Sequence, residues 1–352
     1  MYQLKRAIIR SGLEALYFSG AHRLMEPFVG GVGAILVLHH VRPARSDGFQ
    51  PNRLLEITPT FLEAVIARLK AKDVDFVTLD EVRRRLQEQD FRRRFVTFTF
   101  DDGYRDNKEW AYPILKRHGI PFAIYVPTSF PDRLGELWWA ALEAVVARNA
   151  SIALTMNGRD CRIESGTRGE KFAAFELLYR WLRGMPSDHD MLDAVRDLTT
   201  RYGVDVGAIC DELCMSWEEL SEIAADPLVT IGAHTVNHVM LAKACDTVAR
   251  SELRMGRAVL EAALGRTPHH LAYPYGDATA AGPREFAIAA ELGFRTAVTT
   301  RPGVLFPEHG TTLTALPRIS INGEFQRERY IDVLLSGAGT ALWNGLRRLR
   351  VA

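Results

Sequence analysis

Residues 95–103 combine a strand-forming run with two adjacent carboxylates. Residues 95–100 are aromatic and β-branched, which predicts a buried strand, and the run stops at Asp101, Asp102 and Gly103. In α/β folds, active sites are built at the carboxyl ends of parallel strands. This stretch alone is consistent with two interpretations: an Asp-Gly turn that ends a strand, or a pair of carboxylates of which one holds a cation and the other handles a proton.

Strand and helix patterns alternate around this segment. Strands are predicted at residues 33–39, 76–79, 95–100 and 122–126, and helices at 59–72, 80–90 and 108–118. Such alternation is typical of a parallel sheet with crossover helices. We therefore expect an α/β protein, and 352 residues suit a single α/β barrel.

A second predicted strand ends in a pair of histidines. His234 and His238 are four residues apart, so a helical turn after the strand would place both imidazoles on one face. Two neutral imidazoles and one carboxylate are a familiar ligand set for a catalytic Zn²⁺ that keeps a fourth position for water. Such a pair arises easily by chance, but together with Asp101 and Asp102 at another strand end it indicates a metal site.

A third strand end carries the segment Tyr273-Pro274-Tyr275-Gly276. Residues 99–104, 234–238 and 273–276 resemble the ordered motifs of the polysaccharide deacetylases, the NodB-homology enzymes of the fourth carbohydrate esterase family. Smaller similarities lie at residues 37–41, 216–220 and 316–319. The resemblance covers residues 34–130 and 215–322. It implies a distorted, TIM-like (β/α) barrel of about seven strands.

The resemblance also implies an activity. The expected protein is a metal-dependent hydrolase that removes acetyl groups from N-acetylhexosamine units of an oligo- or polysaccharide. Asp102, His234 and His238 would hold the divalent metal, and Asp101 would be the general base. Zn²⁺ is the expected metal, although Co²⁺, Ni²⁺ or Fe²⁺ suit the same ligands. Two alternatives stay open: an O-acetyl esterase, and a non-catalytic saccharide-binding protein on the same barrel.

Three further residues are expected at the substrate site. The backbone N–H of Tyr273, or of a neighbour in its turn, would stabilise the oxyanion of the tetrahedral intermediate. Tyr275 is predicted either to form a wall of the acetyl pocket or to be a packed core tyrosine. Arg318 is expected to bind substrate or to orient Asp101, which would keep the base ionised.

The sequence departs from the family pattern in its proton donor. Many members carry a histidine in a late Leu-x-Ile-x-x-His-Asp motif and an arginine in the third motif. Residues 316–323 contain no histidine, and residues 273–276 contain no arginine. His39, at the end of the first predicted strand, is the preferred substitute for the general acid. A packed core or loop histidine is the alternative interpretation.

The chain is predicted to be one domain, residues 1–352, with two additions to the barrel. Residues 1–30 are a helical lead-in, and residues 132–214 are a mainly helical insertion that includes one hairpin turning at Asn157-Gly158. Residues 341–352 are predicted to form a short basic helix.

A tryptophan pair lies near the start of the predicted insertion. Trp138 and Trp139 are expected to be core anchors, with stacking on sugar rings as the alternative.

Charge and hydropathy limit the partners. The 44 basic and 43 acidic residues nearly cancel, leaving a net charge of +1, so no nucleic-acid partner is expected. No stretch approaches the ~20 apolar residues that a membrane span needs. Residues 2–26 are expected to pack on the barrel, with peripheral contact to a membrane surface as the alternative. The sequence has no convincing signal peptide, so the expected location is cytoplasmic. The expected partner is an acetylated saccharide. No oligomeric state is predicted.

Overall fold

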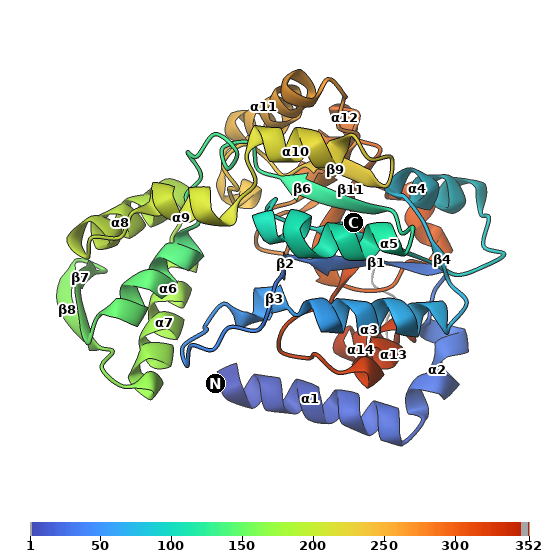
Figure 1. Ribbon diagram of the computed structural model, residues 1–352, viewed down its shortest axis with the longest axis horizontal. Helices are drawn as coiled ribbons and strands as arrows, with labels where there is room; N and C mark the ends of the chain where they lie inside the picture. The colour runs from blue at the N-terminus through green and yellow to red at the C-terminus, as the bar shows by residue number, and fades with distance from the viewer. Residues whose placement is uncertain (1, 346–350, 352) are drawn as a thin grey trace.

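Parallel strands close into a barrel in the computed structural model, which describes residues 2–345 and 351 (Figure 1). The strand order is β1-β12-β11-β10-β9-β6-β5, and β5 pairs back onto β1. The short strand β4 pairs with the start of β5 outside this ring. The predicted α/β barrel of about seven strands is therefore confirmed.

The elements have the following bounds. The strands are β1 Gly33–Leu38, β2 His40–Val41, β3 Glu56–Ile57, β4 Asp75–Phe76, β5 Phe95–Phe100, β6 Phe122–Val126, β7 Ser151–Met156, β8 Arg159–Glu164, β9 Val229–Ala233, β10 His270–Ala272, β11 Thr296–Pro302 and β12 Leu316–Ser320. The helices are α1 Tyr2–Phe18, α2 Ala21–Val29, α3 Pro59–Lys70, α4 Leu79–Glu88, α5 Tyr112–Arg117, α6 Trp138–Arg148, α7 Arg168–Arg183, α8 Asp188–Arg201, α9 Val206–Leu213, α10 Trp217–Ala224, α11 Asp246–Leu264, α12 Pro283–Glu291, α13 Glu328–Leu335 and α14 Ala338–Trp343.

Alternation along the strands divides their side chains between two cores. Phe98 and Phe100 of β5 pack in the large core that includes the covering helices. Phe95 belongs to a separate core formed mainly by strand residues. Successive side chains of a strand point to opposite faces, so Thr97, Thr99 and Asp101 all point away from the face that carries Phe98 and Phe100. This register directs the Asp101 carboxylate toward the barrel axis instead of toward the helices.

One predicted element boundary is wrong, and one predicted helix has an irregular first turn. Leu79 begins α4 instead of ending a strand, because the Thr78 side chain accepts a hydrogen bond from the Glu81 N–H and caps the helix. The predicted helix at 108–118 begins with a π-helical turn over Asn107–Ala111 and continues as α5. π-Helical turns are frequent at functional sites, and this one follows the Asp-Asp segment.

Helices α6–α9 and the hairpin β7–β8 lie between β6 and β9 in the chain and occupy the left of Figure 1. They pack around a hydrophobic core of their own. The side chains of Trp138 and Trp139 are buried in this core, only 1% and 6% exposed. They are core anchors, and stacking of their rings on sugars is ruled out by this burial.

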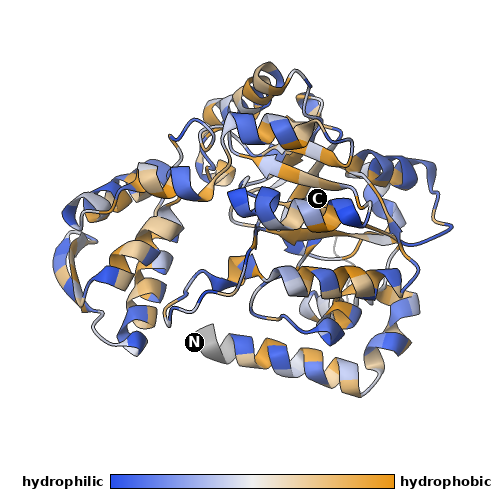
Figure 2. Cartoon of the chain, in the orientation of Figure 1, coloured by the Kyte–Doolittle hydropathy of each residue, from blue (hydrophilic) through white to orange (hydrophobic). Residues whose placement is uncertain are grey.

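The N-terminal helix α1 packs against α13. Leu13 is buried against Tyr330 and Val333, and the Glu14 carboxylate accepts hydrogen bonds from Arg329 and from the Tyr330 hydroxyl. Hydrophilic and hydrophobic residues alternate along α1 (Figure 2). None of the described helices is long and apolar enough to cross a membrane. The predicted basic helix at 341–352 lies partly outside the described residues.

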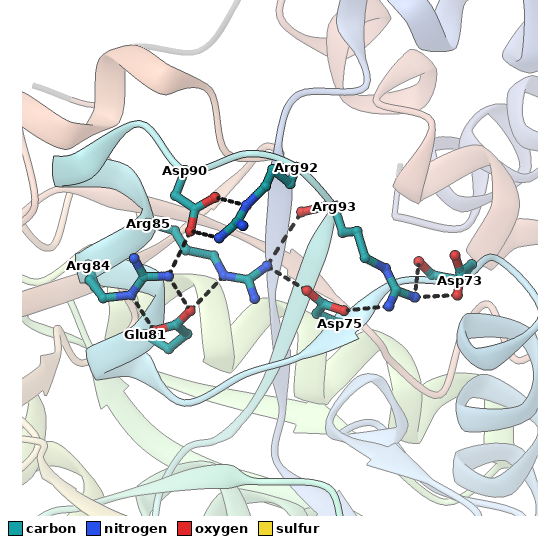
Figure 3. A network of polar contacts seen from close by, with 8 residues as sticks. All are labelled: Asp73, Asp75, Glu81, Arg84, Arg85, Asp90, Arg92 and Arg93. Atoms are coloured by element: carbon teal, nitrogen blue, oxygen red, sulfur yellow. Dashed lines mark hydrogen bonds and ion pairs between the residues drawn. The ribbon is translucent and has the colours of Figure 1, made fainter.

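A network of charged side chains lies at the start of β5, at the end of the strand opposite Asp101 (Figure 3). Arg92 pairs with Asp90 at 2.9 Å, Arg85 pairs with Asp75 at 2.8 Å, and Arg93 pairs with Asp73. The basic residues before this strand therefore face acidic partners and do not form an uncompensated cationic patch.

Candidate active site

The predicted site residues come together at the carboxyl ends of the barrel strands. His39 follows β1, Asp101 and Asp102 follow β5, and His234 follows β9. Arg318 lies within β12 and reaches Asp101 from across the barrel. This end of a parallel barrel is where catalytic residues are usually found.

Asp102, His234 and His238 form a compact group of possible metal ligands. Their ligand atoms all lie within 4.8 Å of one another, and the three residues are buried. The Nε2 atoms of His234 and His238 lie 3.4 and 3.2 Å from Asp102 Oδ1. The structure thus brings together the residues that the sequence placed on two different strands.

The donor set fits a divalent metal. His234 Nδ1 lies 2.7 Å from the carbonyl oxygen of Ala272; because a carbonyl only accepts, Nδ1 carries the proton and the Nε2 lone pair is free. Asp102 Oδ1 is buried without a hydrogen-bond partner among the described residues. Two imidazoles and a carboxylate around such an atom suit Zn²⁺ or a similar ion.

The loop that carries the histidines is a bend, and the predicted helical turn is wrong. The Thr235 side chain accepts a hydrogen bond from the His238 N–H at 3.0 Å. Glu252 of α11 accepts from the N–H groups of Val236 and Asn237. These two acceptors, one local and one distant in sequence, curve the chain so that both imidazoles reach Asp102.

Close approach of α11 to this loop depends on Gly256. A Cβ atom at this position would lie 2.7 Å from the carbonyl oxygen of Thr235, closer than packed atoms tolerate. The glycine therefore allows α11 to bring Glu252 against the loop.

Unusual backbone conformations gather at the site. Asp102, Thr235, His238 and Tyr275 have φ of 72°, 66°, 54° and 61°. Positive φ is uncommon for residues other than glycine and costs most for a β-branched residue such as Thr235. Local strain of this kind is typical of functional sites, where the surrounding structure holds the chain in place.

Asp101 forms a bidentate ion pair with Arg318. Nη1 and Nη2 each lie 2.7 Å from one oxygen of the carboxylate, and Nε donates to the carbonyl of Thr299 at 2.8 Å. Arg318 is fully buried. Its guanidinium is committed to the protein, so the expectation that Arg318 contacts substrate is not met, whereas its contact with Asp101 is present.

Charges around the two aspartates favour their ionised forms. Burial alone would raise the pKa of Asp101, but the Arg318 guanidinium more than offsets it and holds that pKa below its ordinary value. Burial opposes ionisation of Asp102 too, yet the imidazoles of His238 and His234 hold its pKa well below the usual range. Both carboxylates are therefore available as anions at neutral pH.

Replacing Arg318 by Met should shift the pH dependence and lower stability. Without the Arg318 guanidinium, burial is opposed only by the smaller effects of His234 and His39. The pKa of Asp101 should therefore rise, and the acid limb of the kcat/KM profile should move to higher pH. The buried charge left unpaired should lower the free energy of unfolding by about 3–5 kcal/mol. In the wild type, this ion pair stabilises the folded protein fully at any pH above the pKa that Asp101 has in the unfolded chain. This stabilisation is lost as the pH falls through the lower pKa that Asp101 has in the folded protein.

Denaturant unfolding and pH–rate profiles of Arg318→Met check this prediction, with Arg318→Lys as the charge-preserving control. An acid limb that stays in place in a folded Arg318→Met protein would contradict the assigned contact.

His39 lies beside both aspartates. Its imidazole is half-buried, and its pKa is lowered because burial outweighs the opposing effect of the Asp102 and Asp101 charges. Its backbone carbonyl accepts a hydrogen bond from the Asn107 side chain at 2.7 Å. His39 thus lies at the same end of the barrel as the two aspartates.

The predicted oxyanion donor, the backbone N–H of Tyr273 in the third motif, is already used in a hydrogen bond. The N–H of Tyr273 already donates to the carbonyl of Val298 at 3.1 Å, and its hydroxyl donates to the carbonyl of Thr314 at 2.8 Å. Tyr273 is therefore a core residue and not a substrate ligand. Tyr275 borders the site instead: its ring centroid lies 4.8 Å from that of His238, and its hydroxyl accepts from Trp138 at 2.8 Å.

Sequence reasoning missed the residues that enclose the histidines. The rings of Phe130 and Trp139 lie 6.0 and 5.1 Å from the ring of His238. Tyr104 is fully buried and accepts a hydrogen bond from the Trp139 indole at 3.1 Å. Tyr104 stands in the Asp-Asp-Gly-Tyr motif and Trp139 in the tryptophan pair, whereas nothing local signals Phe130.

The comparisons with known proteins agree with this architecture. The family model described as polysaccharide deacetylase matches residues 88–168 and 188–297, together more than half of the chain. The fold and the buried Asp-His-His group thus define a protein of the polysaccharide deacetylase class, and the chain belongs to the polysaccharide deacetylase family. No curated protein sequence matches it.

Solved structures with the same fold are distant in sequence. The Streptococcus pyogenes deacetylase PplD, solved in complex with acetate, is 19% identical; the match covers 82% of this chain and 92% of that one, with a TM-score of 0.54. IcaB from Ammonifex degensii is also 19% identical, with 88% and 98% covered and a TM-score of 0.54. At this identity the likeness shows the shared barrel fold.

Proposed function

We propose that this protein is a metal-dependent hydrolase that removes acetyl groups from N-acetylhexosamine units of an oligo- or polysaccharide. One observation carries the proposal: the buried ligand group Asp102–His234–His238 lies next to an ionised carboxylate, Asp101, at the reacting end of the barrel. Family membership supports an acetylated saccharide as the substrate class.

Asp102, His234 and His238 would hold the ion, which we expect to be Zn²⁺. A divalent metal bound there lowers the pKa of the water it coordinates and polarises the acetyl carbonyl. Asp101 takes the proton from the attacking water as general base. Arg318 holds that carboxylate in position and keeps it ionised.

The remaining groups act on the carbonyl and on the leaving amine. The new C–O bond forms at the acetyl carbon, and the amide bond between that carbon and the nitrogen breaks, so the nitrogen stays on the sugar. The backbone N–H of Tyr275 is the proposed oxyanion donor, since that of Tyr273 is already bonded. His39 is neutral at rest because its pKa is lowered, so it passes to the departing nitrogen the proton that Asp101 took from the water, and acetate and a free amino sugar leave the site.

His39→Ala should lower amide hydrolysis by about 10²–10⁴-fold, because the departing amine needs a proton. Hydrolysis of 4-nitrophenyl acetate should fall much less, since 4-nitrophenolate leaves without one. Parallel kcat/KM measurements on both substrates check this prediction. An equal loss on the two substrates would assign His39 a structural role.

The proposed function is tested by acetate released from N-acetylglucosamine oligomers and from an O-acetylated saccharide, assayed with the metal-loaded protein. Release from the N-acetylated oligomers is the expected result. Release from the O-acetylated saccharide alone would replace the amidase assignment by an esterase, and no release from either would favour a binding protein.

A further inference from the structure

Arg183, the last residue of α7, contacts the loop that follows β10. Its guanidinium carbon lies 4.2 Å from the centre of the Tyr275 ring, and Nη2 donates to the Asp277 carboxylate at 2.8 Å. A cation over an aromatic face and a charge-assisted hydrogen bond both stabilise such a contact. One side chain of the segment between β6 and β9 therefore holds this loop at two points.

The end of α7 also contacts the histidine loop. Nη1 of Arg183 lies 2.9 Å from Sδ of Met240, two residues after His238. The Arg183 carbonyl accepts a hydrogen bond from Lys243 at 2.8 Å, and the Asp188 carboxylate accepts one from the Met240 N–H. Arg183 thus lies where the histidine loop and the loop after β10 meet.

Tyr275 connects Arg183 to the reacting groups. Its ring centroid lies 4.8 Å from that of His238, and its N–H, the proposed oxyanion donor, donates to no group among the described residues. Its φ of 61° lies in the left-handed region, which a residue other than glycine keeps only where its surroundings hold it. Thr300 holds the backbone, since its hydroxyl donates to the Tyr275 carbonyl at 2.5 Å, and Arg183 holds the side chain.

An oxyanion donor is sensitive to such support. The donor has to lie about 2.7–3.1 Å from the position that the oxyanion will occupy. A displacement of about 1 Å at a reacting centre costs about 10²-fold in rate. A turn with a left-handed residue at its centre is expected to shift when it loses one of its anchors.

We propose that Arg183 is a positioning residue for the hydrolysis. By holding the Tyr275 ring and the Asp277 carboxylate, it keeps the N–H of Tyr275 directed at the developing oxyanion. The inference rests on the proposed function for the reaction itself. It gives residues 132–214, which we propose to be an insertion in the barrel, a part in catalysis, because this segment supplies Arg183.

Substitutions of Arg183 and of its partner test this role. Arg183→Met removes the charge and the ion pair with Asp277 but keeps an unbranched side chain, and Arg183→Lys keeps the charge. Asp277→Asn removes the ion pair from the other side. Arg180 lies on the same helix, is exposed and contacts Glu176 of that helix, so Arg180→Met is the matched control.

The first readout is the kinetics of the metal-loaded protein on the N-acetylglucosamine trimer, at a temperature where every variant is folded. Arg183→Met should lower kcat by about 10–100-fold and change KM by less than about threefold, because an oxyanion donor binds the transition state more tightly than the substrate. Arg183→Lys should lose less than about fivefold, and Arg180→Met should match the wild type. Asp277→Asn should lower kcat less than Arg183→Met does, and the double variant should be no slower than Arg183→Met alone.

The second readout is hydrogen–deuterium exchange of the metal-stripped protein, which does not depend on turnover. The amides of residues 273–279 should exchange faster in Arg183→Met than in the wild type and in Arg180→Met, because the turn has lost an anchor.

With an active wild type, three results would overturn the inference: an unchanged kcat in folded Arg183→Met, a rise in KM at constant kcat, or unchanged exchange at residues 273–279. An inactive wild type is a separate result, which would reject the proposed hydrolase and this inference with it.

Discussion

Asp101→Asn should lower acetate release from N-acetylglucosamine oligomers by about 10²–10⁴-fold, the usual contribution of a general base. The amide has nearly the shape of the carboxylate but cannot accept a proton at neutral pH. The three metal ligands are left in place, so metal content should stay at the wild-type value. Initial rates and metal content, measured on the same preparation, check both statements.

Stability has to be controlled in this experiment. Asp101→Asn leaves the buried charge of Arg318 without its partner, which should lower the melting temperature. Rates are therefore compared at a temperature where the variant is fully folded. Asp90→Asn removes a carboxylate–arginine pair in the network at the opposite end of β5 and is the matched control. A rate within tenfold of wild type in folded Asp101→Asn would reject Asp101 as the base.

Asp102→Ala should abolish both metal binding and activity. This carboxylate is the only anionic member of the ligand group, and its Oδ1 atom faces both imidazoles. Loss of an outer-sphere partner alone lowers metal affinity by roughly 10–100-fold, and loss of a direct ligand should lower it further. Metal titration of the metal-stripped variant, followed by an acetate assay, measures both effects.

The control for this second prediction is a histidine outside the ligand group. His118 pairs with Glu63 away from the site, so His118→Ala should keep both the metal affinity and the rate. If Asp102→Ala bound Zn²⁺ as tightly as wild type, the ligand group would have to be reassigned.

Much of the barrel could be predicted because its strands carry strong local signals. The bounds of β5 and β6 match the predicted 95–100 and 122–126, since each run of apolar and β-branched residues ends abruptly. The meeting of Asp102 with His234 and His238 was also predictable, because the carboxyl ends of parallel strands share one edge of the sheet.

Contacts between distant segments could not be predicted in the same way. Glu252 lies within a long helix, and its position gives no sign that its carboxylate shapes the histidine loop. The N–H of Tyr273 is occupied by Val298 of another strand, which the motif alone does not reveal. Because this contact between β10 and β11 is visible only in the structure, only the structure leads us to propose the N–H of Tyr275 as the oxyanion donor.

The most direct test of the central claim is acetate release from N-acetylglucosamine oligomers by metal-stripped wild-type protein during titration with Zn²⁺. The structure predicts a rate that rises from background and saturates at one ion per chain, because a single ligand group of this kind is found among the described residues. The rate should stay at background in Asp102→Ala throughout. Equal rates with and without metal, or no acetate at any Zn²⁺ concentration, would contradict the proposed metal-dependent deacetylase.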